Sequence, residues 1–207
     1  MIDLPPRSLL LVVSAPSGGG KTTLCERLLA EFDQMIYSVS CTTRPPREGE
    51  VDGVDYYFIS EAEFEKRVRA GEFLEHAIVH GHRYGTLRRF IERGFATGRD
   101  VLMDIDVQGA AQIRASLAAL PPNDPLRLGF VDVFIAPPSI EVLRKRLYLR
   151  GKDSDEVIER RIAQAEQELS RWREYQYLII NDRLDASYDA LRAIVVAEHR
   201  RVARRAV

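Results

Sequence analysis

The sequence predicts an α/β fold in which a mostly parallel sheet is flanked by helices. Two observations support this. Short apolar runs alternate with segments of helical periodicity along the chain, which is typical of consecutive βα units. The first apolar run, residues 9–13, leads into a glycine-rich turn and then into a helical pattern. With 207 residues, of which 45% are hydrophobic, the chain can bury one sizeable core.

Three further apolar runs, residues 100–105, 131–135 and 177–180, are expected to form the remaining core strands. Each run is short, rich in aliphatic side chains and bounded by polar or turn residues. Elsewhere apolar residues recur at helical spacing. This spacing predicts helices over residues 21–32, 87–97, 107–117, 140–149, 154–172 and 184–204.

Residues 37–86 differ from this pattern and are typical of an insertion. Short strand-like pieces at residues 56–59 and 73–79 surround one helical stretch at residues 61–70, and turn residues are frequent. We therefore expect an inserted mixed α/β subdomain. Residues 121–125 read PPNDP and are expected to form a surface loop, because proline disrupts both a helix interior and a central strand.

Charge and composition argue against several classes of protein. The formal net charge is −1, so the chain has no overall basic field for nucleic acid or for an anionic membrane. No apolar run approaches the roughly 20 residues of a membrane-spanning helix, and residues 1–8 lack a secretory pattern. Cys25 and Cys41 have neither metal-ligand nor disulfide spacing. We expect a cytoplasmic protein without nucleic-acid or membrane partners. The sequence does not indicate whether the chain forms oligomers.

The glycine-rich turn is close to the P-loop pattern that binds nucleoside triphosphates. Its residues are Ala15, Pro16, Ser17, Gly18, Gly19, Gly20, Lys21, Thr22 and Thr23. In a P-loop, backbone N–H groups surround phosphate oxygens, the lysine reaches the β- and γ-phosphates, and a hydroxyl binds Mg²⁺. Ala15 stands where the strict pattern has glycine, so the first turn must accept a methyl group. A purely structural glycine turn is the alternative.

A second group of phosphate-binding candidates lies in the predicted insertion. Arg44 and Arg47 flank a Pro-Pro kink, and arginine is suited to bidentate binding of phosphate. Tyr56 and Tyr84 follow along the chain. Taken alone, the two arginines are better interpreted as solvated charges on an exposed loop. The P-loop in the same chain favours the phosphate-binding interpretation.

Charged residues also gather at two other places. Asp104 and Asp106 lie two residues apart at the end of a predicted strand, so both can approach one site. Such an acidic strand end holds Mg²⁺ in P-loop proteins, although the two carboxylates could instead cap the next helix. Arginines and lysines are concentrated between residues 144 and 161, around the turn residue Gly151.

Together these motifs resemble those of the guanylate kinase family. The resemblance runs from about residue 8 to about residue 196, and the motifs follow the family's order. They are VSAPSGGGKTTL, SVSCTTRPPREGEVDGVDYYF, GEFLEHA, YGT, LMDIDVQGA, FIAPPS and RLYLRG followed by ERRI. The family commonly has alanine at the position of Ala15, so this residue departs from the general pattern and not from the family.

The resemblance implies a site for GMP. The residues implied for its phosphate are Ser40, Arg44, Arg47, Tyr56 and Tyr84, and those implied for guanine are Glu75, Thr86 and Asp106. Guanine presents N1–H and N2–H₂ donors and an O6 acceptor, so a carboxylate and a hydroxyl complement it. Adenine would leave the carboxylate unpaired. A buried polar group without a partner costs about 1–3 kcal/mol, which is enough for base selectivity.

The resemblance also implies a site for ATP as co-substrate. The P-loop residues Ala15 to Thr23 would bind its phosphates, Asn181 would lie near adenine, and Mg²⁺ would bind Thr22, Asp104 and Asp106. Phosphoryl transfer depends mainly on positioning and on neutralising charge. The residues implied in catalysis are therefore cations, Lys21 and Arg44 with the lid arginines Arg146, Arg150 and Arg161.

The expected architecture is one guanylate kinase-like domain over residues 1–207. Its parts are a P-loop NTPase-type parallel sheet core (8–36, 87–140 and 170–207), a GMP-binding insertion (37–86) and a helical lid (about 141–169). The expected reaction transfers the γ-phosphoryl group of Mg-ATP to GMP, and to dGMP, in purine nucleotide metabolism. ADP and GDP are the products with GMP.

Two alternatives remain open at this point. Guanylate-kinase-like interaction modules bind proteins without catalysis, but they typically have an eroded phosphate loop, whereas Gly18, Gly20, Lys21 and Thr22 are intact. A P-loop kinase of the same fold could act on another nucleotide or on a sugar phosphate. A metal site at His80 and His82 is disfavoured because no acid or cysteine has matching spacing, and the basic C-terminal residues are ordinary for a helix end.

Overall fold

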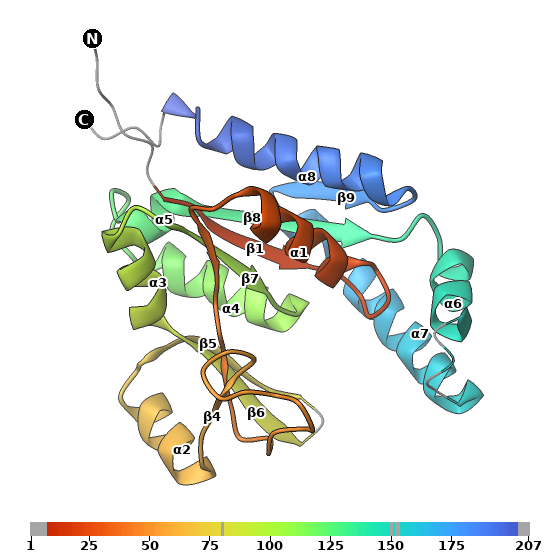
Figure 1. Cartoon of the computed structure of the whole chain (residues 1–207), viewed down its shortest axis with the longest axis horizontal. Helices are drawn as coiled ribbons and strands as arrows, with labels where there is room; N and C mark the ends of the chain where they lie inside the picture. Colours follow the sequence, from red (N-terminus) through yellow and green to blue (C-terminus); the bar gives the residue numbers. More distant parts are fainter. Residues whose placement is uncertain (1–7, 80, 150, 152–153, 203–207) are drawn as a thin grey trace.

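The computed structural model describes residues 8–79, 81–149, 151 and 154–202, and in these residues it contains two β-sheets. The larger sheet is parallel, with the strand order β2-β7-β1-β8-β9. Its strands are β1 (Leu10–Ser14), β2 (Met35–Tyr37), β7 (Asp100–Asp104), β8 (Phe130–Ala136) and β9 (Tyr177–Ile180). Helices cover both faces of this sheet (Figure 1), which confirms the predicted α/β class.

The two faces of the larger sheet carry separate apolar cores. The covering helices are α1 (Lys21–Glu31) and α8 (Leu184–Glu198) on one face, and α3 (Arg88–Ala96), α4 (Val107–Ala118) and α5 (Pro125–Gly129) on the other. β1 lies in the middle, and because side chains alternate along a strand, Leu11 and Val13 face α1 and α8. Leu10 and Val12 face the other helices. All of β1 is therefore buried, as its continuous apolar sequence predicts.

The smaller sheet forms a mixed α/β subdomain, as predicted for the insertion. Its elements are β3 (Cys41–Thr42), β4 (Tyr57–Phe58), α2 (Glu61–Arg69), β5 (Phe73–Val79) and β6 (His82–Leu87), with the strand order β4-β3-β6-β5. Phe64 of α2 stacks on Phe73 of β5 with ring centroids 4.5 Å apart. The backbone N–H of His76 in β5 donates to Gln112 of α4 at 3.1 Å. The subdomain is thus tied to the helix that covers the larger sheet.

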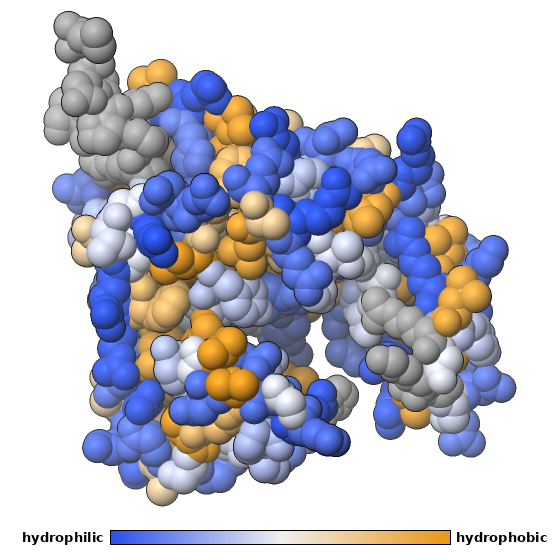
Figure 2. All heavy atoms as spheres, in the orientation of Figure 1, coloured by the Kyte–Doolittle hydropathy of each residue, from blue (hydrophilic) through white to orange (hydrophobic). Residues whose placement is uncertain are grey.

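The helices α6 (Ile140–Leu149) and α7 (Asp155–Leu169) pack against each other beside the end of the larger sheet (Figure 1). They share a small core made of Leu143, Leu147, Ile158, Ile162 and Ala165. Figure 2 shows an open cleft between these two helices and the smaller sheet. The carboxyl ends of the parallel strands lie at the top of this cleft, where α/β proteins bind ligands.

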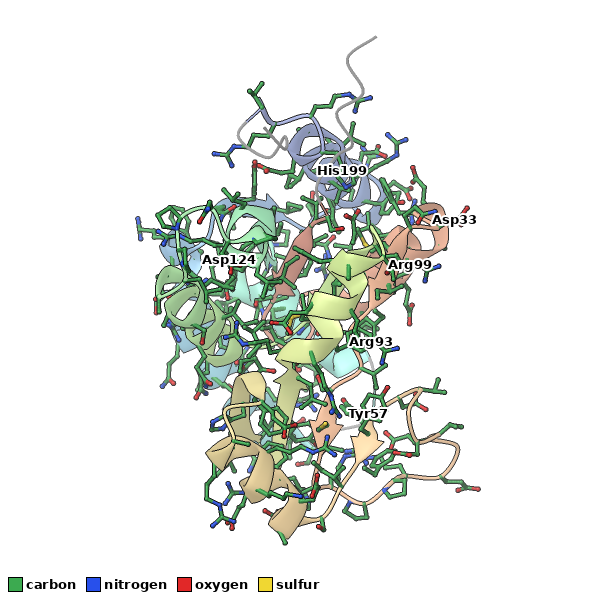
Figure 3. All side chains as sticks on the ribbon, turned by 90° about the vertical axis from the view of Figure 1, so that its left-hand side faces the viewer. Asp33, Tyr57, Arg93, Arg99, Asp124 and His199 are labelled. Carbon is green, nitrogen blue, oxygen red and sulfur yellow. The ribbon has the colours of Figure 1, made fainter. Side chains whose placement is uncertain are left out.

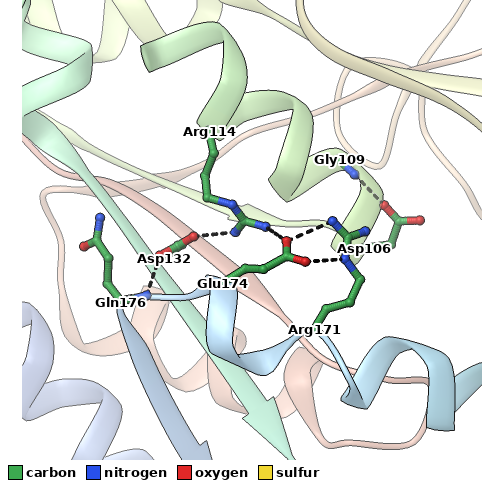
Figure 4. A network of polar contacts seen from close by, with 7 residues as sticks. All are labelled: Asp106, Gly109, Arg114, Asp132, Arg171, Glu174 and Gln176. Carbon is green, nitrogen blue, oxygen red and sulfur yellow. Dashed lines mark hydrogen bonds and ion pairs between the residues drawn. The ribbon is translucent and has the colours of Figure 1, made fainter.

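A polar network fixes the segment that follows α7, including the 3₁₀ helix η1 (Trp172–Glu174) (Figure 4). Arg114 of α4 donates to the buried carboxylate of Asp132 at 2.6 Å and to Glu174 at 2.7 Å. Arg171 also donates to Glu174, at 2.8 and 2.9 Å. The network therefore joins the end of α7 to both α4 and β8.

The sequence prediction missed β2 and α5, and in the insertion it named neither β3 nor β6. β2 is a three-residue edge strand in which only Met35 is buried, so no periodicity marks it. It ends at Tyr37, within the range predicted for the insertion. Pro125, predicted to lie in a surface loop, instead begins α5, where the carboxylate of Asp124 accepts a hydrogen bond from the N–H of Leu126 at 2.8 Å. Proline is favourable at a first helical position because its missing N–H needs no partner there.

Two predicted helices were too long at their C-terminal ends. α7 ends at Leu169 and gives way to η1, and α8 ends at Glu198. His199 follows α8 and lies 2.8 Å from the buried carboxylate of Asp100, which also accepts from the N–H of Leu9. Cys25 and Cys41 are buried and unbonded to each other. In the described part of the chain no helix is both long and apolar enough to cross a membrane.

We predict that Arg114→Met lowers the free energy of unfolding by about 3–5 kcal/mol, because it leaves the buried carboxylate of Asp132 without its cation. The matched control is Arg171→Met, whose partner Glu174 is 42% exposed. An exposed pair contributes at most about 1 kcal/mol. Urea unfolding of both variants measures the difference. Equal losses would contradict the role given to Asp132.

Candidate active site

The predicted P-loop joins β1 to α1, and its neighbours fix its backbone. Gly18 and Gly20 have positive φ angles of 89° and 91°, which other residues rarely accept. A Cβ atom on Gly20 would lie 2.2 Å from Nδ2 of Asn181, and this amide donates to the carbonyl oxygen of Gly19 at 2.8 Å. Ala15 is buried in the core that contains α1, so its methyl group contributes to packing. Asn181, expected near adenine, therefore also supports the loop.

Helix α6 lies directly against this loop. A Cβ atom on Gly18 would come within 2.9 Å of Leu143 and 3.1 Å of Leu147. Between them in sequence, Arg146 donates from its guanidinium to the carbonyl oxygen of Asn181 at 2.8 Å. Arg146 was expected to contact phosphates, and in this structure its guanidinium binds the carboxyl end of β9. A shift of α6 would therefore change the packing of its leucines against the P-loop.

The loop surrounds a cavity of about 300 Å³, called here the loop pocket. Its lining residues are Ala15, Pro16, Ser17, Gly18, Gly19, Gly20, Lys21, Thr22, Thr23, Asp106 and Glu168. Nζ of Lys21 lies 2.5 Å from Oδ1 of Asp104 and 3.3 Å from the carbonyl oxygen of Ile105. Two acidic residues that are distant in sequence, Asp106 and Glu168, thus line the same cavity as the predicted phosphate loop.

A second cavity, of about 270 Å³, lies between the two sheets and is called here the tyrosine pocket. Its lining residues are Tyr37, Ser40, Asp55, Tyr56, Glu75, Ala77, Val79, Tyr84, Asp104, Ile105 and Asp106. Five of the predicted GMP-binding residues are among them: Ser40, Tyr56, Glu75, Tyr84 and Asp106. Thr86 is buried next to the pocket, where its hydroxyl lies 3.2 Å from that of Ser40.

Arg44 lies behind two of the tyrosines and is held rigidly. Its guanidinium forms a bidentate ion pair with Glu50 at 2.8 and 2.9 Å, donates to the hydroxyl of Tyr84 at 3.2 Å and lies 5.4 Å from the ring centroid of Tyr56. This ion pair, with help from the N–H of Arg47, lowers the pKa of the Glu50 carboxyl to about 2. The side chain of Arg47 is exposed, and neither of the two predicted arginines is part of the pocket lining; Arg44 contacts the lining residues Tyr84 and Tyr56.

Glu75 is the buried acid of the tyrosine pocket, with 6% of its surface exposed. It lies on β5 opposite Thr86 of β6. Burial raises the pKa of the Glu75 carboxyl to about 7; a hydrogen bond from Thr86 opposes this rise and the charge of Asp106 adds to it. Glu75 therefore exchanges its proton near neutral pH, which is unusual for a carboxyl group.

Asp104 is the last residue of β7 and Asp106 lies two residues further on, as predicted, and their contacts differ. Asp104 holds Lys21, whereas Oδ1 of Asp106 accepts from the N–H of Gly109 at 2.8 Å and so caps α4. Asp106 also lines both pockets. Binding of Mg²⁺ stays a prediction, whereas the other interpretation that the sequence left open, the helix cap, is observed for Asp106. This residue stands at the boundary between the cavities.

Several other site residues need separate mention. Arg161 lies on α7 and is partly buried, while Arg150 and His80 are outside the described residues. Sequence reasoning missed Glu50 and Glu168, because each of these acids acquires its neighbours only in the folded chain. Among the described residues, no group of three or more histidine, cysteine or acidic side chains is arranged to hold a metal by itself.

The fold and the site define a P-loop protein with two adjoining pockets. The P-loop, with its backbone N–H groups and its lysine, surrounds one pocket. The other pocket is lined by a buried acid and tyrosines, and an arginine lies beside the tyrosines. An acidic residue, Asp106, belongs to both. This arrangement suits transfer of a phosphoryl group between two bound molecules.

Comparisons with known proteins identify the family. A family model described as guanylate kinase matches residues 7–198. The guanylate kinase of Symbiobacterium thermophilum is 48% identical over 199 residues, which cover 96% of this chain and 90% of that protein. The guanylate kinase of Geobacter sulfurreducens is 46% identical over 95% of this chain and 92% of its own length. The crystal structure of guanylate kinase from Anaplasma phagocytophilum superimposes with a TM-score of 0.75 at 33% identity, covering 98% of this chain and 92% of that one.

The chain belongs to the guanylate kinase family, which confirms the resemblance seen in its motifs. It is an enzyme, and the reaction of the family is transfer of a phosphoryl group from ATP to GMP. The alternative of a non-catalytic interaction module is thereby set aside. Gly18, Gly20, Lys21 and Thr22 all line the loop pocket, which agrees with an active kinase.

We predict that Gly109→Ala weakens GMP binding by roughly tenfold without weakening ADP binding. A Cβ atom at this position would lie 3.1 Å from Oε2 of Glu75 and 3.3 Å from Cδ1 of Ile105, so the Glu75 carboxylate would have to shift, whereas Oδ1 of Asp106, at 3.4 Å, would be in ordinary van der Waals contact. Alanine is the better helix former by about 1 kcal/mol, so stability should not fall. Calorimetric titration with each nucleotide measures the effect. Unchanged GMP affinity would contradict the position assigned to the Glu75 carboxylate.

Proposed function

We propose that the loop pocket binds the phosphates of ATP, that the tyrosine pocket binds GMP, and that the two substrates meet at Asp106. The observation that best supports this is that Asp106 lines both cavities. The γ-phosphate of ATP must approach the phosphate of GMP closely, and adjoining pockets satisfy this requirement. Lys21 and the N–H groups of the loop would bind the donor phosphates.

The acceptor phosphate is proposed to bind Ser40, Arg44, Arg47, Tyr56 and Tyr84. Arg44 supports this assignment, since Glu50 and Tyr84 hold its guanidinium in one orientation beside the pocket. Such a fixed guanidinium loses little conformational entropy when it binds phosphate. Arg47, on the same exposed loop, can fold over the phosphate from the solvent side.

Guanine is proposed to bind Glu75, Thr86 and Asp106. In its ionised form the Glu75 carboxylate would accept from N1–H and N2–H₂ of the base, and Thr86 would donate to O6. An adenine in the same position would leave the buried carboxylate unpaired, at a cost of about 1–3 kcal/mol. These contacts do not involve the ribose 2′-hydroxyl, so we propose dGMP as a second acceptor.

Mg²⁺ is proposed to bind at the boundary of the two pockets, through Thr22, Asp104 and Asp106. Carboxylate and hydroxyl oxygens are the ligands that this cation prefers, which supports the donor set. When bound, the ion would neutralise charge on the transferred phosphoryl group. Asp104 is paired with Lys21 at 2.5 Å, so movement of the lysine to the donor phosphates would free this carboxylate.

The remaining proposal concerns closure of the cleft. We propose that residues 141–169 act as a lid, residues 37–86 as the GMP-binding part, and residues 8–36, 87–140 and 170–207 as the core. Arg146, Arg150 and Arg161 would then reach the phosphates as the open cleft of Figure 2 narrows. Closure excludes water, which would otherwise compete with GMP for the phosphoryl group. The two buried thiols agree with a reducing, cytoplasmic setting, where the reaction would serve purine nucleotide metabolism.

A substrate panel tests the assignment of the acceptor. Purified protein with Mg-ATP is given GMP, dGMP, AMP, CMP or UMP, and ADP formation is followed. Turnover is expected with GMP and dGMP only. If GMP gives no turnover above the rate with water alone, the proposed function is wrong. Equal rates with AMP would contradict only the assignment of Glu75 to the base.

GMP binding should depend on pH through Glu75. Because the free protein has a Glu75 pKa of about 7 and guanine needs the ionised carboxylate, GMP affinity should fall as the pH is lowered through 7. Each unit below 7 is expected to cost up to about tenfold in affinity. The phosphate of GMP also titrates, near pH 6. Glu75→Gln, which keeps that second titration but loses the first, is the control, and identical pH profiles for the two proteins would contradict this assignment.

A further inference from the structure

Glu168 is an acidic residue in a pocket that must bind a polyanion. It lies one residue before the end of α7 and lines the loop pocket together with the whole P-loop and Asp106. Figure 1 shows that this end of α7 lies beside the loop between β1 and α1, whereas the other end of the helix points away from the sheet. The lining of the loop pocket therefore contains one cationic side chain, that of Lys21, and two carboxylates, those of Asp106 and Glu168.

The side chain of Glu168 is held by a hydrogen bond and interacts electrostatically with Asp106 and Lys21. Oε1 accepts from the side-chain amide of Gln164 at 2.9 Å, one turn earlier on α7. Burial raises the pKa of the Glu168 carboxyl; the hydrogen bond from Gln164 opposes this rise, Asp106 adds to it, and Lys21 opposes it. Asp106 and Lys21 thus both act on Glu168 across the pocket.

Two carboxylates in a phosphate-binding pocket affect the binding of a metal-free nucleotide more than the binding of its complex with a divalent cation. A nucleotide without a metal carries three or four negative charges on its phosphates, and these repel Asp106 and Glu168. A divalent cation cancels two of those charges, and water molecules in its shell donate hydrogen bonds to nearby carboxylates. The same pair of acids therefore opposes the metal-free form and tolerates the complexed form.

We propose that Glu168 makes the loop pocket selective for the magnesium complex of the nucleotide over the metal-free nucleotide. This inference rests on the donor role proposed above for the loop pocket. Glu168 acts through electrostatic repulsion across the cavity, and it contributes no ligand to the metal. Its benefit for the enzyme is that donor molecules unable to support transfer are excluded before they occupy the site.

The test compares ADP binding with and without metal in three proteins. ADP is titrated calorimetrically, without GMP, into the wild-type protein, Glu168→Gln and Glu166→Gln, first with excess MgCl₂ and then with EDTA. Glutamine at position 168 removes the charge but keeps the size of the side chain, and its amide oxygen can still accept from Gln164. Glu166 is exposed on the same helix and absent from the pocket lining, so its variant controls for loss of one charge.

Glu168→Gln is expected to raise the affinity for metal-free ADP by roughly five- to tenfold, with little gain for Mg-ADP, since a repulsion of this size is typical of like charges across a partly solvated pocket. Glu166→Gln should leave both affinities as in the wild type. An unchanged ratio of the two affinities in Glu168→Gln would overturn this inference and leave the donor role intact. Failure of the wild-type protein to bind ADP at all would overturn both.

Discussion

The parallel pairing of β1 with β7 fixes the centre of the site, where Lys21 and Asp104 form an ion pair. Val13 of β1 is paired in register with Asp104 of β7, so the P-loop and the two acids emerge from adjacent strands at one edge of the sheet. Asp106 then starts α4 with a backbone cap, which fixes its carboxylate between the pockets. A parallel sheet thus determines which residues from distant parts of the chain can act together.

A chain with a net charge of −1 must attract two phosphorylated substrates with local charge. Three cations of the site, among the residues that the structure describes, already have a protein partner. Lys21 is held by Asp104, Arg44 by Glu50 and Arg146 by the carbonyl oxygen of Asn181. Substrate phosphates would bind to cations that their protein partners already position, so these three cations are not left unpaired before binding.

How far the sequence predicts this structure depends on how local the signal is. β1, the P-loop and the capping residue Asp106 are marked by runs of neighbouring residues, and they are found where expected. The edge strand β2 has only one buried residue, so no local pattern of apolar residues marks it. The side chains of Asp33 and Arg99, close to the start of this strand and of β7, are exposed (Figure 3). Glu168 resembles any polar residue of α7 until the fold brings it to the loop, and tertiary contacts of this kind cannot be predicted from spacing alone.

The adjoining pockets have their simplest explanation in a single site that spans Asp106. Adenosine and guanosine joined at their 5′ positions by a chain of phosphates form a molecule that fits only such a site. Titrated calorimetrically in the presence of Mg²⁺, it should bind one molecule per chain, more tightly than either nucleotide, and compete with both ATP and GMP. Competition with only one of the two substrates, or binding of two molecules per chain, would contradict a continuous site.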